Sequence, residues 1–321
     1  MATTSFPSIL ESMRLSPIIS GDIVDVVAPA SACSRQELKD GVAAIRALGL
    51  VPRLPKDIFG KSILFSNSDA KRLAHFKRAI YAADSSLLWC VRGGYGAIRL
   101  MPEIEKWKRP KHAKILLGYS DITTLHVHLN QRWHWPTLHG PLLDRLGRNA
   151  LKPKELRELL GLLYGRSQSV HFPGLKAMNP EARRVRVVRA KILGGNMAVL
   201  QSALGTPSAL RPKSCILFFE DLGERPHRVD RMLTQFAQAG WFKGCRAIVL
   251  GDFILKEPKD RRHLWQDVFA RFASEVNVPL VAGLPVGHDP RRNRTLPLNA
   301  PAELHLGPRP SLHVATGIKR K

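Results

Sequence analysis

The sequence is short of cysteine. Its 321 residues include four cysteines, and none of them forms a CxxC pair. This scarcity argues against a disulfide framework or a cysteine-based zinc site, and it is typical of a protein from a reducing cytoplasm. Cys90 and Cys215 stand inside apolar stretches, so we expect buried and unreactive thiols.

Long apolar stretches are also missing. No segment approaches the roughly 18 uninterrupted apolar residues that a membrane-spanning helix needs. Residues 1–20 lack the basic start and clean apolar core of a signal peptide, because Glu11 and Arg14 interrupt them. We therefore expect a soluble, cytoplasmic protein without a membrane partner.

Acidic residues are few compared with basic ones. Lys and Arg number 50 and Asp and Glu 26, which gives a formal net charge of +24. Such an excess raises the alternative of a non-catalytic nucleic-acid-binding protein. The positive charge gathers in segments 145–191 and 285–321, which contain no interleaved aromatic pattern, zinc-finger spacing or RNP motif. A solvated basic surface is therefore favoured over nucleic-acid binding, with attraction of acidic substrates as a weaker functional interpretation.

Apolar stretches that alternate with amphipathic ones predict a mostly parallel α/β sheet in the first part of the chain. The expected strands are 22–28, 87–91 and 114–117. The expected helices are 34–48, 69–83 and 121–132. Ser34 and Glu37 have the spacing of a capping box, which places the start of the first helix.

The regular alternation is lost between 145 and 184, and a second unit begins near 185. The clearest elements after 185 are strands at 215–219, 246–250 and 278–281 and helices at 228–239 and 261–273. The segment 145–184 reads as a basic interdomain connection with a short helix near 153–163. The predicted division is an N-terminal extension 1–21, an N-terminal α/β domain 22–144, this connection, and a C-terminal domain 185–321.

Two expected strands of the first unit end in glycine-marked turns, at the edge of the sheet where parallel sheets bind ligands. The stretch 92–96 (RGGYG) follows the strand at 87–91, and it suits an oxyanion hole, a phosphate-binding loop or a plain tight turn. Gly118-Tyr119-Ser120-Asp121 joins the next strand to a helix, as a nucleophile elbow does. Ser120 would stand equally well there as a helix N-cap.

Two further turns offer an acid and a base. Glu220 follows the strand at 215–219, where a carboxylate is well placed to orient a histidine, although Asp221 and Glu224 compete with it. His288 follows a Leu-Pro-Val-Gly turn. His126 and His128 suggest a metal site at first sight. Their spacing argues against it, because helix positions two apart do not face each other.

These motifs, in this order, resemble the LD-carboxypeptidase family of serine peptidases, which includes the microcin C immunity peptidases. The resemblance covers roughly residues 22–306. The matching stretches are VAPAS (27–31), RGGYGAIRL (92–100), GYSDIT (118–123), HGP (139–141), GGN (194–196), GTP (205–207), ED (220–221), DRML (230–233), GLPVGH (283–288) and LPL (296–298). Each stretch alone is a weak signal, and together in register they are a strong one.

The resemblance implies a role for particular residues. Ser120 is the implied nucleophile, His288 the base and Glu220 the acid that orients the base, which demotes Asp221. The backbone N–H groups of Gly94 and Asp121 are the implied oxyanion hole. The substrate-pocket candidates are Arg92, Gly93, Tyr95 and His139. No metal or organic cofactor is implied.

Members of this family combine an N-terminal parallel-sheet domain, similar to the class I glutamine-amidotransferase fold, with a smaller C-terminal α/β domain. They often form homodimers. Their usual reaction removes the terminal D-alanine from a murein tetrapeptide during cell-wall recycling. The resemblance therefore implies a murein peptide substrate and a homodimer.

Two departures concern supporting structure or the pocket rim, and they affect the expected substrate more than the expected triad. His227 stands where an aromatic residue is common, and Asn299 stands where glycine often follows Pro-Leu. They leave open that the same triad detoxifies a microcin-like peptide–nucleotide instead. Phe253 and Trp265 are conceivable contributors to a nucleotide pocket in that case.

Overall fold

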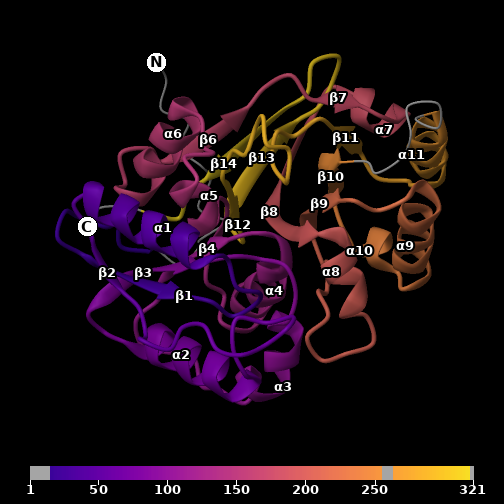
Figure 1. The fold of residues 1–321 in the computed structure, drawn as a ribbon. Coiled ribbons are helices and arrows are strands. Elements are labelled where there is room, and N and C mark those ends of the chain that lie inside the picture. The colour runs from indigo at the N-terminus through magenta and orange to yellow at the C-terminus, as the bar shows by residue number, and fades with distance from the viewer. Residues whose placement is uncertain (1–14, 255–262, 319–321) are drawn as a thin grey trace.

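The computed structural model describes residues 15–254 and 263–318, which form a mixed α/β fold on two sheets (Figure 1). The six strands of the first sheet lie in the order β12 (Leu296–Leu298), β5 (Thr137–His139), β4 (Ile115–Gly118), β3 (Ser85–Cys90), β1 (Ile23–Val27) and β2 (Val51–Arg53). Neighbouring strands run parallel, except that β12 runs antiparallel to β5.

Helices cover both faces of the first sheet. They are α1 (Arg35–Ala47), α2 (Asp69–Tyr81), η2 (Ala97–Leu100), α3 (Met101–Ile104), η3 (Ser120–Ile122), α4 (Thr123–Arg132), α5 (Leu143–Gly147) and α6 (Pro153–Leu163). One face packs against α1, α5 and α6, and the other against α2, α3 and α4. Burial of a parallel sheet on both sides explains why its strands read as continuous apolar runs.

The second sheet holds eight strands within the described residues. Their order is β6 (Ser169–Phe172), β14 (Ser311–Ala315), β13 (Pro301–His305), β8 (Val187–Asn196), β9 (Cys215–Leu222), β10 (Ala247–Ile254), β11 (Leu280–Ala282) and β7 (Lys176–Ala177). The four strands from β8 to β11 are parallel, and the outer strands pair antiparallel.

One face of the second sheet carries helices, and the other faces the first unit. The remaining helices are α7 (Pro180–Arg183), α8 (Met197–Ser202), α9 (Pro226–Gln238), α10 (Trp241–Gly244) and α11 (His263–Glu275). Of these, α8 to α11 pack on the first face. The second face packs against β12 and α6, so these two elements lie where the two sheets meet (Figure 1).

The predicted elements are present with shifts of a few residues at their ends. Ser34 and Glu37 form the expected capping box. The strands at both edges of the second sheet were not predicted, and two of them, β6 and β7, lie in the segment 145–184 that reads as a connection. None of the helices in the described ranges is long and apolar enough to cross a membrane.

Candidate active site

The turns singled out in the sequence meet at one edge of the two sheets. Ser120 follows β4, the loop at 92–96 follows β3, and Glu220 lies near the end of β9. His288 follows β11. Ser120 and His288 line one cavity of about 490 Å³, together with Arg92, Gly93 and Gly94.

Ser120 has a strained backbone. Its φ is 66°, in the left-handed region that costs a non-glycine residue about 1–3 kcal/mol. The strain arises because β4 turns sharply into η3 and α4 at this residue, which leaves the side chain half-buried at the cavity wall. This is the geometry of a nucleophile elbow. The N-cap positions of η3 and α4 are Tyr119 and Ile122, so Ser120 is not the N-cap of either helix.

The glycine at 93 makes room for the Ser120 side chain. A Cβ atom at Gly93 would lie 2.7 Å from Cβ and 2.9 Å from Oγ of Ser120. Gly94 has a φ of 86°, and a Cβ atom there would collide with the hydroxyl of Ser31. Gly93 is therefore required by the close approach of Ser120, and Gly94 by its positive φ and the close approach of Ser31.

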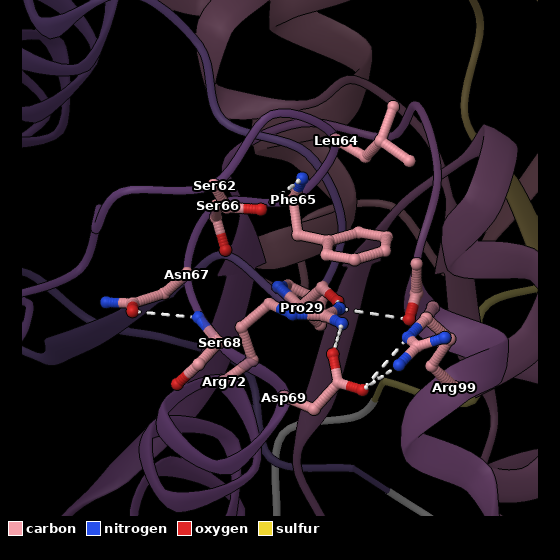
Figure 2. A network of polar contacts seen from close by, with 12 residues as sticks. Pro29, Ser62, Leu64, Phe65, Ser66, Asn67, Ser68, Asp69, Arg72 and Arg99 are labelled. Carbon is pink, nitrogen blue, oxygen red and sulfur yellow. Dashed lines mark hydrogen bonds and ion pairs between the residues drawn. The ribbon is translucent and has the colours of Figure 1, made fainter.

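A buried arginine fixes the far end of the same loop (Figure 2). Nη1 of Arg72 donates hydrogen bonds to the carbonyls of Pro29 and Gly96, and Nη2 pairs with Asp69 at 2.6 Å. The guanidinium carbon lies 4.7 Å from the centre of the Phe65 ring. Arg72 thus ties the loops after β1 and β3 to the first turn of α2.

Asp121 joins the loop to the elbow. Its Oδ2 accepts a hydrogen bond from the backbone N–H of Ala97 at 2.7 Å. Burial raises the pKa of this carboxyl to about 6, although Ala97 and the charge of Arg72 act in the opposite direction. This hydrogen bond ties the residue after Ser120 to the first residue of η2.

His288 and Glu220 form a close pair. Nδ1 of His288 lies 2.6 Å from Oε2 of Glu220, whose side chain is fully buried. Burial alone would lower the pKa of His288, but the charge of Glu220 and its hydrogen bond outweigh it, so the pKa is raised. The imidazole also packs edge-on against Tyr119, the neighbour of Ser120, with 4.6 Å between the ring centres.

The two competing carboxylates have other partners. Asp221 accepts hydrogen bonds from the backbone N–H groups of Ala198 at 2.8 Å and Leu222 at 2.7 Å, so it holds the first turn of α8. Burial and the neighbouring Glu220 raise its pKa to about 7. Glu224 pairs with Arg228 at 2.7 Å. Glu220 is the one of the three that contacts His288.

Two pocket candidates lie outside the cavity lining. His139 is 1% exposed and sits behind Glu220, with 3.8 Å between its Nε2 and Oε1 of Glu220, so a substrate in the cavity cannot touch it. Tyr95 is 47% exposed and packs at a tilt against Phe65, and it is not part of the cavity wall. The expectation that both line the pocket is therefore corrected.

The residues considered for a nucleotide pocket and for a metal site lie elsewhere or have other contacts. Trp265 is buried against Phe253 and Phe269 in the core of the second unit, away from the cavity lining. Nε2 of His126 lies 2.8 Å from the carbonyl of Gly118, whereas His128 packs against Trp133. Within the described ranges no group of three or more His, Cys, Asp or Glu side chains could hold a metal ion.

All four cysteines are buried, which includes Cys90 and Cys215, whose apolar surroundings predicted it. Burial raises the pKa of Cys33 and of Cys215 to about 12. Two residues near the site were not singled out from the sequence. They are Arg72, which holds the loop at 92–96, and Arg145, which lines the cavity. The available signal for Arg72 was its spacing of four from Phe76, which puts a charge on the apolar face of α2.

Comparisons with known proteins agree with the geometry. Residues 24–140 match the LD-carboxypeptidase N-terminal domain, and residues 189–304 match the LD-carboxypeptidase C-terminal domain. A putative carboxypeptidase of Rickettsia conorii is 32% identical over 270 residues, which are 83% of this chain and 82% of the relative. The murein tetrapeptide carboxypeptidase of Pseudomonas aeruginosa is 30% identical over 289 residues, 88% of this chain and 92% of its own.

Solved structures share the fold. Muramoyltetrapeptide carboxypeptidase from Oxalobacter formigenes superposes with a TM-score of 0.80 at 25% identity, over 91% of this chain and 98% of its own. A MccF-like protein from Bacillus anthracis gives a TM-score of 0.82 at 19% identity, over 95% of this chain and all of its own. The sequence matches and the shared fold lead to one conclusion: this chain belongs to the LD-carboxypeptidase family of serine peptidases.

Proposed function

We propose that this peptidase hydrolyses the bond to the terminal D-alanine of murein tetrapeptides in cell-wall recycling, using Ser120, His288 and Glu220 as a triad. The observation that carries the proposal is the 2.6 Å contact between His288 and Glu220 at the wall of the cavity that contains the strained Ser120. The substrate follows from the relative in Pseudomonas aeruginosa that is named a murein tetrapeptide carboxypeptidase.

The chemistry is acyl transfer in two steps. The Ser120 hydroxyl attacks the scissile carbonyl carbon while Nε2 of His288 accepts its proton. The carbon–nitrogen bond then breaks, His288 gives the proton to the departing amine, and the acyl group stays on Ser120 as an ester. A water molecule that His288 deprotonates hydrolyses this ester and restores the free serine.

Two backbone N–H groups, those of Gly94 and Asp121, are the proposed oxyanion hole. In another enzyme with an oxyanion hole, the loss of one such donor slows the reaction by about 100- to 1000-fold. The position of Ser120 at the start of η3 and α4 adds the favourable field of a helix N-terminus. No metal ion or organic cofactor takes part in this scheme.

The test is incubation of the purified protein with murein tetrapeptide, followed by mass spectrometry. Release of one D-alanine and formation of the tripeptide support the proposal, and Ser120→Ala serves as the control. A wild-type protein that leaves the tetrapeptide intact would overturn the assignment of substrate.

The alternatives have weaker support. The MccF structures are 18–19% identical and share the fold, so they carry no argument for a peptide–nucleotide substrate. The remaining expectations from the family resemblance are a homodimer, a cytoplasmic location, the domain limits given above and the likeness of the first unit to the class I glutamine-amidotransferase fold. Sedimentation equilibrium of the purified chain tests the dimer.

A further inference from the structure

Arg145 is a cation of the cavity with no acidic partner among the described residues. It lies on α5 and lines the same cavity as Ser120 and His288. In the part of the chain that the structure describes, no carboxylate lies within ion-pair distance of it. Its side chain forms a hydrogen bond with Tyr119, whereas its Nε and Nη2 are buried without a hydrogen-bond partner. Arg145 is half-buried, and two buried N–H donors without acceptors are unfavourable unless a ligand supplies the acceptors.

The other two arginines of the cavity differ in this respect. Arg92 pairs with Asp144 at 3.3 Å, and Arg148 pairs with Asp144 at 2.6 Å and with Glu37 at 3.2 Å. Their charges are compensated by the protein itself. An anionic group that enters the cavity therefore finds its free cation at Arg145.

Arg145 lies near the proposed base. Its charge offsets part of the burial effect that raises the pKa of Tyr119 to about 12, and it opposes the raised pKa of His288. His288 must give its proton to the departing amine, so the released residue has to lie beside this imidazole. In an α-amino acid the carboxylate is two bonds from that amine, which brings it toward a cation near His288.

We propose that Arg145 binds the free α-carboxylate of the residue that is released, and thereby restricts cleavage to the end of a peptide. This inference rests on the proposed function, because it takes Ser120 and His288 as the reacting pair. A planar guanidinium can bind both oxygens of a carboxylate, which a point charge cannot do as well. A peptide without a terminal carboxylate would leave the positive charge of Arg145 without an anionic partner and would be rejected.

The experiment compares two tetrapeptides that differ in one group. One ends in D-alanine and the other in D-alaninamide, and kcat/KM is measured for both with mass spectrometric detection of the tripeptide. We expect wild type to prefer the acid by about 100-fold or more. Arg145→Gln should lose most of this preference by losing activity on the acid, while its activity on the amide stays within a few-fold of wild type. Arg145→Lys should be intermediate.

Arg148→Gln is the matched control. It removes a cation from the same cavity, but one that is already paired, so the variant should keep the acid-to-amide preference. Labelling of Ser120 by a neutral fluorophosphonate checks each variant, because that reaction needs the serine and its base but no carboxylate. We expect Arg145→Gln to be labelled at a rate within a few-fold of wild type.

The outcomes separate this inference from the proposed function. Wild type that cleaves the acid and the amide equally well overturns the role of Arg145, while the peptidase assignment stands. An unchanged preference in a labelled Arg145→Gln protein has the same meaning. Wild type that is labelled but cleaves neither peptide overturns the proposed substrate and this inference with it.

Discussion

Nδ1 of His288 lies 2.6 Å from Oε2 of Glu220, although 68 residues separate the two in the chain. In the proposed triad the Glu220 oxygen accepts this hydrogen bond, which places the proton on Nδ1 and leaves Nε2 as the basic nitrogen. Glu220 itself is fully buried at the centre of the second sheet, which fixes the orientation of the imidazole.

The first prediction concerns Glu220 and its neighbour. Glu220→Gln should lower kcat/KM by about 1000- to 10,000-fold, because the amide no longer supports the imidazolium or selects its tautomer. Asp221→Asn should keep far more activity, since Asp221 binds backbone N–H groups of α8 and does not contact His288. Steady-state kinetics on the tetrapeptide measure both. Circular dichroism must show that Glu220→Gln is folded, and equal losses in the two variants would contradict the assignment.

The second prediction is a pH dependence. Glu220 raises the pKa of His288 against the opposing effect of burial. His288 must be neutral to act as a base, so activity is lost below its pKa and gained as the pH rises through it. In Glu220→Gln the raising influence is gone, and the acidic limb of the kcat/KM profile should move to lower pH. A limb that stays in place or moves to higher pH would separate His288 from the observed ionisation.

The extent to which sequence predicts this structure depends on how local each feature is. The capping box of α1 and the helix α6 depend on residues a few positions apart, and both were predictable. Strand β12 has three residues, and its partner β5 lies more than 150 positions earlier, so no local pattern indicates the pairing. The outer strands β6 and β7 were not predicted for the same reason, because their partners β14 and β11 lie far along the chain.

The site shows the same division. The glycines at 93 and 94 and the elbow at Ser120 stand in short motifs, whereas the positions of Arg72 and Arg145 depend on which loops the fold brings near them. The backbone conformation at Asn299 accounts for one departure from the family pattern, in which glycine often follows Pro-Leu. Its φ is 53°, a left-handed conformation that glycine adopts freely and that asparagine tolerates better than most residues.

The third prediction tests the buried arginine of Figure 2. Arg72→Met should lower the free energy of unfolding by about 2–4 kcal/mol, because it leaves the carbonyls of Pro29 and Gly96 without their donor. Arg99 binds the same Asp69 from a half-exposed position, so Arg99→Met should cost less than about 1 kcal/mol. Urea unfolding measures both values. Equal costs would mean that Arg72 contributes no more than a surface ion pair.

The last prediction concerns Ser120 and His288 as one unit. Ser120→Ala should lower kcat by about 10⁵- to 10⁶-fold, and His288→Ala should cost nearly as much, because an unactivated serine hydroxyl is a poor nucleophile near neutral pH. The double variant should be scarcely slower than either single variant, since each one already disables the same proton transfer. Single and double variants are compared by kcat on the tetrapeptide and by fluorophosphonate labelling. If the two losses multiply, the residues act in separate steps, and the shared cavity at Ser120 and His288 would then require another explanation.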